Sequence, residues 1–315
     1  MTGTSGFIGS HVARVLATGG AEVVALVRPG SGLWRIRDIV TDVELVETDI
    51  TRLSESTSAF RGVDTILHLA AAGVGPHTGE VDLVGTNVLG TVSLLALSRK
   101  LDLARFVYCG SCFEYGAGRR VAEHAPLRPR TAYAASKSGG WLLADAAATS
   151  ENLPLVTLRP FTVYGPFEAP HRLVMGSVLR ALAGLPLELT NGDQQRDFVY
   201  VDDAVEAVIA AASSDAALGG VFNVCSGNAT AVRDVAAEIA DAAGGSIEIR
   251  LGALPTRAGE ADILTGHPGH ARAVLGFQTR TSLREGIERS VAWARRHGSL
   301  YQPVDVAGTT TRVRS

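Results

Sequence analysis

The sequence predicts an α/β protein, built as a doubly wound parallel sheet with a smaller C-terminal lobe. Over the first half of the chain, short β-rich runs alternate with amphipathic helical stretches, which is typical of a parallel sheet covered on both faces. A glycine-rich turn directly precedes the first helical stretch. With 315 residues, the chain is also longer than one hydrophobic core usually absorbs, which favours an added lobe.

The strands and helices follow one another in chain order. The expected strands are Glu22–Val27, Val43–Val46, Thr65–Leu69, Phe106–Tyr108 and Leu155–Arg159, and the expected helices are Ile8–Thr18, Val84–Lys100 and Ala134–Thr149. After Gly165 this alternation becomes less regular, and we expect Val221–Cys225 to return to the main sheet as a strand. Thr230–Ala243 and Leu283–Arg296 have the periodicity of helices and belong to the lobe.

Domain boundaries follow from this pattern. We place the sheet domain at residues 1–165, joined by 200–227. The lobe covers 166–199 and 228–301, and the polar segment 302–315 is expected to be a mobile tail.

The N-terminus departs from the pattern. A sheet of this type needs a strand before its glycine turn, but the sequence starts at the turn itself. We therefore hypothesise that the natural chain begins upstream and that Met1 occupies a strand-end position. The intact mass of the natural protein tests this hypothesis, because a native terminus at Met1 would refute it.

Composition excludes several classes of function. The net charge of -3 gives no reason to expect nucleic acid or an anionic membrane as a partner. No apolar run has the length of a membrane span, and the N-terminus lacks the features of a signal peptide. Cys109, Cys112 and Cys225 provide no disulfide framework, so we expect a reducing, cytoplasmic location. The C-x-x-C spacing ends a strand instead of opening a helix, so we expect neither redox chemistry there nor a metal site.

The glycine turn indicates a dinucleotide site. Gly3, Gly6 and Gly9 have the spacing that lets a backbone turn sharply and approach a pyrophosphate. The helix that follows offers free N–H groups and a partial positive charge.

From here the sequence resembles a known family. The segment T-G-T-S-G-F-I-G is similar to the fingerprint of extended short-chain dehydrogenases/reductases of the NAD-dependent epimerase/dehydratase type, which act largely on nucleotide sugars. The resemblance extends from Thr2 to about Trp293. Its further segments are Asp49-Ile50, His68–Ala71, Asn87-Val88 with Gly90-Thr91, Ser111–Gly116, Tyr133–Lys137, Arg159-Pro160 with Tyr164–Pro166, Arg196–Phe198, and Arg257 with Gly259-Glu260. The resemblance implies a Rossmann fold and a nicotinamide cofactor.

The end of the second expected strand bears on the choice of cofactor. A carboxylate there would bind the ribose 2′-hydroxyl of NAD, but this chain has Val27 followed by Arg28. Arg28 could pair with a 2′-phosphate, helped by Ser31 or Arg35. The pattern favours NADP(H), with NAD(H) as the alternative. The residues expected to bind the cofactor are Gly3, Ser5, Gly6, Phe7, Ile8, Gly9, Arg28, Ser31, Asp49, Ile50, Leu69, Ala70, Ala71, Asn87, Tyr133, Lys137 and Pro160.

The expected reacting centre is Tyr133, Lys137 and Ser111. Tyr133 and Lys137 are one helical turn apart on the same face. Of the 29 basic residues only two are lysines, and one of them is Lys137. We expect the Lys137 ammonium to lower the pKa of the Tyr133 phenol. The resemblance implies that Ser111 hydrogen-bonds the reacting oxygen.

Several reactions share such a centre. The segment from Gly110 to Gly116 is similar to reductases of NDP-4-keto-6-deoxyhexoses, so we expect 4-ketoreduction first and 4-epimerisation second. Dehydratases of the family carry Asp-Glu where this chain has Cys112 and Phe113, although a bulge could re-aim Glu114. A non-catalytic dinucleotide sensor and a reductase of a non-nucleotide ketone are the remaining alternatives.

The lobe supplies the expected substrate site. Arg196 and Arg257 match the arginines that hold the sugar-nucleotide diphosphate in the family, and planar guanidinium groups suit paired phosphate oxygens. The residues expected to bind substrate are Ser111, Cys112, Phe113, Thr162, Leu173, Val174, Arg196 and Arg257. Thr162 replaces an Asn of relatives. The helices near Val88–Arg99 and Ala134–Thr149 pair into a homodimer in relatives, and the alternative is that they only cover the sheet.

Overall fold

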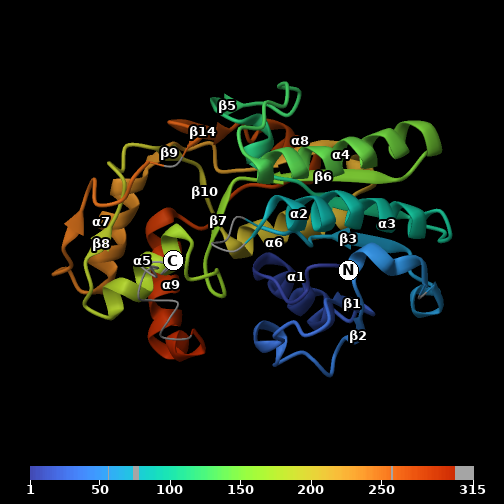
Figure 1. The fold of residues 1–315 in the computed structure, drawn as a ribbon, viewed down its shortest axis with the longest axis horizontal. Coiled ribbons are helices and arrows are strands. Elements are labelled where there is room, and N and C mark those ends of the chain that lie inside the picture. Colours follow the sequence, from blue (N-terminus) through green and yellow to red (C-terminus); the bar gives the residue numbers. More distant parts are fainter. Residues whose placement is uncertain (56, 74–77, 257, 302–315) are drawn as a thin grey trace, which may run out of the picture.

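A four-stranded parallel sheet lies at the centre of the computed structural model, which describes residues 1–55, 57–73, 78–256 and 258–301 (Figure 1). Its strands, in spatial order, are β11 (Val221–Val224), β6 (Leu155–Pro160), β4 (Arg105–Cys109) and β3 (Thr65–His68). Every residue of β4 is buried, as expected of a strand covered on both faces. The strand expected over 221–225 is thus β11, and it lies beside β6.

Two further strands continue the sheet on the side of β3. β1 (Val24–Val27) and β2 (Glu44–Glu47) form a parallel pair. Thr2 links this pair to the main sheet because it bridges both Leu26 and His68. The glycine turn therefore follows directly from the point where the two parts of the sheet meet.

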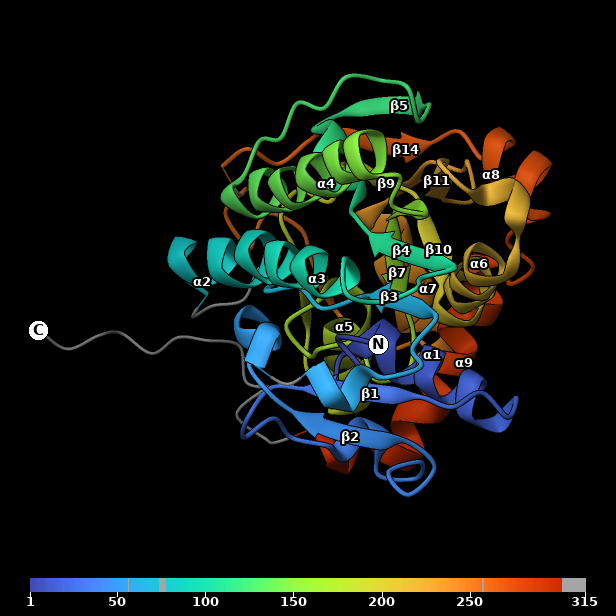
Figure 2. The same ribbon diagram turned by 90° about the vertical axis from the view of Figure 1, so that its right-hand side faces the viewer.

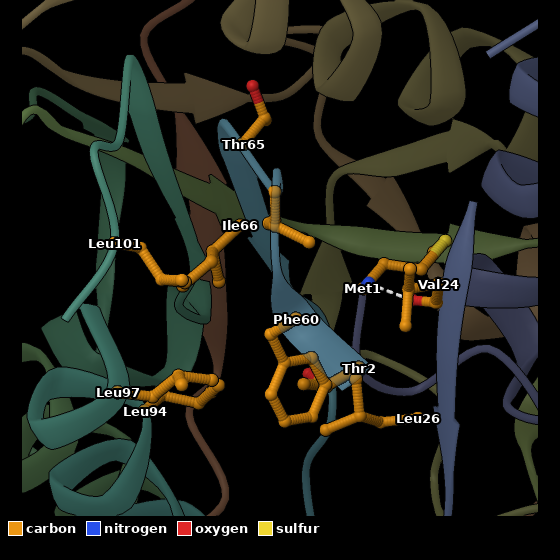
Figure 3. A pocket seen from close by; sticks show the side chains of 11 residues that line it. Met1, Thr2, Val24, Leu26, Phe60, Thr65, Ile66, Leu94, Leu97 and Leu101 are labelled. Atoms are coloured by element: carbon orange, nitrogen blue, oxygen red, sulfur yellow. Dashed lines mark hydrogen bonds between the residues drawn. The ribbon is translucent and has the colours of Figure 1, made fainter. Parts of the chain in front are cut away.

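An apolar crevice opens between β1, β3 and α3 (Figure 3). Apart from the bridges to Thr2, in the described part of the chain β1 pairs only with β2, and β3 only with β4. Val24, Ile66 and Leu97 are among the side chains that line the crevice. The Met1 amino group donates a hydrogen bond of 2.5 Å to the Val24 carbonyl, and its burial lowers the pKa of the amino group to about 5.

Helices cover both faces of the sheet (Figure 2). α1 (Phe7–Thr18) contacts α6 (Val201–Ser213), which packs on β4 and β6. The other face carries α3 (Gly90–Ser98) and α4 (Ala132–Glu151), which contact each other.

The helix expected over 84–100 differs from the prediction. It begins earlier, as α2 (Glu80–Val84), passes through a π-helical turn (Gly85–Leu89) and continues as α3. By length and composition this helix, Glu80–Ser98, could cross a membrane, but half of its apolar stretch is buried in protein, and core helices of soluble proteins pass the same test.

The described part of the lobe is built from short strands and the helices α5 (Leu173–Leu182), α7 (Val232–Ala243) and α9 (Leu283–His297). Two of its sheets have two strands each: β7 (Thr162–Tyr164) pairs with β10 (Phe198–Tyr200), and β8 (Leu187–Glu188) pairs with β13 (Ile249–Arg250). A third sheet has four strands, in the order β12 (Thr230–Ala231), β9 (Gln195–Arg196), β14 (Ile263–Gly266) and β5 (Gly118–Val121). Short 3-10 helices lie at Trp34–Ile36, Ile50–Glu55, Thr57–Phe60, Cys112–Tyr115 (η5), Asp215–Ala217 and Gly298–Leu300.

Several elements cross the expected domain boundaries, among them β7, which precedes residue 165 but pairs with β10. β5 precedes residue 165 in the chain but pairs with β14 of the lobe. α8 (Gly269–Leu275) follows residue 228 but packs against β11 of the main sheet. A single hydrophobic core contains residues of both parts, such as Val156 of β6 and Met175 of α5.

Candidate active site

The glycine turn has the geometry that a pyrophosphate site requires. Gly3 has a positive φ of 75°, which side chains other than glycine rarely adopt. A Cβ on Gly9 would overlap the carbonyl oxygen of Gly3, and a Cβ on Gly3 would lie 2.6 Å from the Leu69 carbonyl carbon. The three segments therefore touch backbone to backbone, and only glycine allows this approach.

The N-terminus of α1 is open toward this turn. Gly6 is the N-cap, it offers no side-chain hydrogen bond, and the first turn contains no acidic residue. Free N–H groups at the positive end of a helix attract phosphate. The Gly6 amide donates to the Gly3 carbonyl at 2.9 Å, so the amides of Phe7 and Ile8, in the first turn of α1, are the ones that fit the pyrophosphate of a dinucleotide.

The end of β1 carries a cation and no carboxylate. Val27 is buried, whereas Arg28 is exposed and Ser31 partly exposed. Arg35, which the sequence analysis offers as a helper, is engaged elsewhere: its guanidinium stacks on Trp34 at 4.2 Å and donates to the Phe167 carbonyl. We correct that expectation, because Arg35 joins the sheet domain to the loop after β7.

Other predicted cofactor residues lie at the same carboxyl edge of the sheet. Asp49 accepts hydrogen bonds from the Thr51 amide and hydroxyl, which hold the pKa of its carboxyl low. Ile50 lies against α3, where a Cβ on Gly90 would be only 2.9 Å from it. Leu69, Ala70 and Ala71 directly follow β3, and Pro160 ends β6.

Asn87 ties three segments together from the π-helical turn. Its side chain exchanges two hydrogen bonds with the Ala72 backbone, at 2.8 and 3.1 Å. It also donates to the Ser136 hydroxyl at 2.8 Å. π-helical turns often occur at functional sites. This one fixes the loop after β3 to the helix that carries Tyr133 and Lys137.

The structure brings Ser111, Tyr133 and Lys137 together. Ser111 is the N-cap of η5, directly after β4, and its hydroxyl hydrogen-bonds the Tyr133 phenol. Lys137 is 2% exposed, and its ammonium donates a hydrogen bond of 2.7 Å to the Cys109 carbonyl. Its ammonium also lies 4.8 Å from the centre of the Tyr108 ring.

The electrostatics of this centre differ from the expectation. Burial raises the pKa of Tyr133 to about 12, although part of its side chain reaches solvent. The Arg172 guanidinium is the main opposing charge, followed by the hydrogen bond with Ser111; Lys137 is not among the chief influences. Burial also lowers the pKa of Lys137. We therefore correct the expectation that the Lys137 ammonium lowers the pKa of the phenol: in the ligand-free protein Arg172 is the cation that opposes the effect of burial on this pKa.

Arg172 is a residue that the sequence analysis missed. It is the N-cap of α5, and its charge partly opposes the burial that raises the pKa of Cys112. Its ion pair with Glu168 is loose, at 3.9 Å, and its side chain is 42% exposed. No local pattern singles it out, because the chain has many arginines.

The positions after Ser111 do not offer proton-transfer groups. Cys112 is buried in an apolar cluster, and burial raises the pKa of its thiol. Phe113 packs edge-on against Tyr133, with ring centres 6.3 Å apart. Glu114 is fully buried and paired with Arg159 at 3.0 Å, so no bulge turns it toward the substrate side.

The predicted substrate residues of the lobe have different roles in the ligand-free protein. Arg196 is buried and paired with Glu260 at 3.0 Å. Thr162 is partly exposed, and its amide donates to the Asp197 carbonyl. Leu173 is partly exposed, but the Val174 side chain is packed in the main core, which corrects its expected place in the pocket lining.

Two predicted segments lie outside the described residues. Arg257 and the tail 302–315 are therefore still predictions.

Known proteins match this geometry over nearly the whole chain. A family model described as "NAD dependent epimerase/dehydratase family" matches residues 1–225. A dTDP-glucose 4,6-dehydratase of Streptomyces griseus is 30% identical, covering 98% of this chain and 97% of its own. A UDP-glucose 4-epimerase of Mycolicibacterium smegmatis is also 30% identical, covering 94% and 97%.

A solved structure shows the same fold. The dTDP-glucose 4,6-dehydratase DesIV of Streptomyces venezuelae, with NAD and TYD bound, superposes with a TM-score of 0.90. It is 27% identical, and the match covers 96% of this chain and 98% of that one.

Proposed function

Because the chain belongs to the NAD-dependent epimerase/dehydratase family, we propose that it reduces the 4-keto group of a nucleotide-linked 4-keto-6-deoxy sugar. The centre of Ser111, Tyr133 and Lys137 beside the glycine turn carries this proposal. The turn and the open N-terminus of α1 suit the pyrophosphate of a nicotinamide dinucleotide.

Each residue has a defined task in this reaction. When bound, the nicotinamide cofactor supplies the hydride that reaches C4. Ser111 donates a hydrogen bond to the 4-keto oxygen, and the Tyr133 phenol transfers its proton to that oxygen as it becomes a hydroxyl. Burial raises the pKa of Tyr133 in the ligand-free protein, so the phenol holds its proton at neutral pH, and nearby positive charge such as that of Arg172 makes release of the proton easier. Lys137, one helical turn beyond Tyr133 on α4, is placed to bind ribose hydroxyls.

The end of β1 supports NADP(H) as a consumed reductant. Arg28 is exposed there, and no carboxylate follows Val27 to repel a 2′-phosphate. The solved relative binds NAD, so NAD(H) is the alternative. We expect NADPH to bind more tightly than NADH and Arg28→Ala to reduce that difference in calorimetry, with Arg37→Ala as a surface control. Equal affinities would remove the NADP(H) proposal.

4-Epimerisation is the second candidate. A relative covering most of the chain is named UDP-glucose 4-epimerase, and the same proton donor serves oxidation and re-reduction at C4. 4,6-Dehydration has the least support, although a relative of equal identity is a dehydratase, because Cys112 and Phe113 are apolar and Glu114 is held by Arg159.

One experiment distinguishes these candidates. The protein is incubated with NADPH or NADH and dTDP-4-keto-6-deoxyglucose, and the loss of nicotinamide absorbance is followed. Consumption supports ketoreduction, whereas conversion of UDP-glucose without consumption supports epimerisation. We expect Tyr133→Phe to lower kcat by about 100-fold or more. A Tyr133→Phe variant with full activity would contradict both candidates.

The nucleotide part is tested separately. We expect Arg196→Ala to weaken binding of dTDP and UDP in calorimetry, with Arg180→Ala, which removes the Arg180–Glu188 pair, as a lobe control. A protein that binds NADPH but no nucleoside diphosphate would instead favour a non-nucleotide ketone. A homodimer and a cytoplasmic location complete the proposal.

A further inference from the structure

A buried ion pair lies next to Ser111 of the reacting centre. The proton transfer from Tyr133 to the substrate does not involve this pair. Glu114 of η5 is 0% exposed and Arg159 of β6 is 1% exposed, and they meet at 3.0 Å. Removing two charges from water is costly, so a buried pair is weak evidence for stability by itself. Its contacts indicate a different purpose.

The Glu114 carboxylate fixes the backbone of Ser111. One carboxylate oxygen accepts the Ser111 amide at 2.6 Å, and the other accepts Arg159 Nε at 3.0 Å. The Ser111 hydroxyl in turn accepts the Phe113 amide at 3.3 Å. A Cβ at Gly110 would lie 2.6 Å from the same carboxylate. The turn that presents Ser111 is therefore built around this carboxylate.

Arg159 anchors the carboxylate to the rest of the site. Its guanidinium donates to the Tyr115 hydroxyl at 3.0 Å and lies 4.5 Å from the centre of the Trp141 ring. Trp141 is one helical turn beyond Lys137 on α4. Tyr115 donates to Asn223 of β11 at 2.8 Å. Arg159 thus contacts the Ser111 turn on one side and the helix of Tyr133 on the other.

We propose that Glu114 and Arg159 are positioning residues that hold the Ser111 hydroxyl against Tyr133. The inference rests on the proposed chemistry at C4, because Ser111 and Tyr133 must contact one oxygen together. Misplacing a reacting group by about 1 Å can lower a rate about 100-fold. The Glu114 charge also opposes the effect of burial on the pKa of Lys137.

A double-mutant cycle tests the proposal. We expect Glu114→Gln to lower kcat on the order of 10- to 100-fold with little change in KM. In a Ser111→Ala background, the same substitution should change kcat less than about 3-fold, because the group it positions is already gone. Asp215→Asn is the matched control, since it breaks the Arg105–Asp215 pair at the opposite end of β4. Equal losses in both backgrounds would show a general structural effect and overturn the proposal.

Glu114→Gln leaves the buried Arg159 charge without its partner, and this loss can prevent folding. A second variant keeps the proposal testable in that case. Replacing both charges, as Glu114→Met with Arg159→Met, keeps chain length and often preserves folding. We expect this variant to bind the nicotinamide cofactor, with the Ser111 amide exchanging hydrogen at least about 10-fold faster than in the wild type. Unchanged exchange would overturn the positioning role, even if the wild type turned over no sugar. That absence of turnover would instead contradict the proposed function.

Discussion

The phenol of Tyr133 and the ammonium of Lys137 both lie in surroundings that disfavour their charged forms. Burial raises the pKa of Tyr133 and lowers the pKa of Lys137. Arg172, from the lobe, is the charge that most favours the phenolate. The lobe thus acts on the reacting centre electrostatically.

Arg172→Gln should therefore change the pH dependence of the reaction. In the direction of alcohol oxidation, the phenolate is the base, and removing a nearby cation raises the pKa of Tyr133. We expect the pH profile of kcat/KM to move to higher pH, measured with the reduced sugar and the oxidised cofactor. Arg180→Gln, also on α5, is the control. An unmoved profile in Arg172→Gln would refute the electrostatic role.

His68 makes stability depend on pH. It is buried between Thr2 and Thr91, hydrogen-bonded at 2.9 and 3.0 Å, and burial lowers its pKa to about 3. Because the unfolded value is about 6.5, the unfolded chain binds the extra proton between pH 6.5 and 3. Stability should thus fall as pH falls through this window, by about 2 kcal/mol between pH 6.5 and 5.

Urea unfolding at a series of pH values measures this effect. His68→Gln keeps hydrogen-bonding groups but cannot titrate, so its stability should vary less with pH. If both proteins lost the same stability on acidification, His68 would not be the group responsible.

At the scale of elements, the glycine turn and α1 form one unit with the end of β3. The turn depends on close backbone contact among Gly3, Gly9 and Leu69. The π-helical turn is a second unit, because Asn87 holds the loop after β3 against α4. Both units position backbone groups, and not side chains, at the place where we expect the dinucleotide to bind.

Gly9→Ala should disrupt the first unit. Its Cβ would overlap the Gly3 carbonyl oxygen, so the turn must open. We expect at least about a 100-fold loss of cofactor affinity, or a visibly lower Tm, by calorimetry and thermal melting. Gly85→Ala is the control, because a Cβ there meets nothing within 4 Å. Tight cofactor binding by Gly9→Ala would refute this account of the turn.

The crevice between β1 and β3 gives an engineering prediction. A five-residue extension of β-branched residues before Met1 could pair with both strands and would replace the buried amino group by a peptide. We expect such a variant to melt at least about 4 °C higher than the chain as it stands. A Gly/Ser extension of equal length is the control, and an equal effect of both would contradict strand insertion.

At the scale of the whole molecule, an apolar face is left on α2, α3 and α4. Val81, Leu89, Val92, Leu142 and Leu143 are exposed there. Contiguous exposed apolar groups mark interaction sites in many proteins. The helices that carry these side chains are the ones that the homodimer prediction pairs.

Val92→Glu should therefore dissociate a dimer. A charge in an apolar interface loses hydration without a partner, so sedimentation equilibrium should show a monomer. Leu218→Glu is the matched control, because Leu218 is similarly exposed on another part of the surface. A wild-type protein that is already monomeric would remove the homodimer from the proposal.

The local pattern of this sequence determined much of the architecture. Apolar periodicity is a property of neighbouring residues, so the strands of the main sheet and helices such as α4 begin and end within a few residues of their predicted ranges. The glycine spacing and the Tyr133–Lys137 spacing are equally local, and they located the turn and the reacting helix. β5 was missed because it pairs with β14, which is distant in sequence.

Only the tertiary structure decided the partners of the charged groups. Glu114 meets Arg159, Arg196 meets Glu260, and Arg172 acts on Tyr133, each across a long stretch of chain. A guanidinium can reach any carboxylate or phenol that packing brings near it, and 27 of the 29 basic residues are arginines. Which one acts on a given group depends on how the lobe folds over the sheet, and this long-range packing leaves no periodic trace in the sequence.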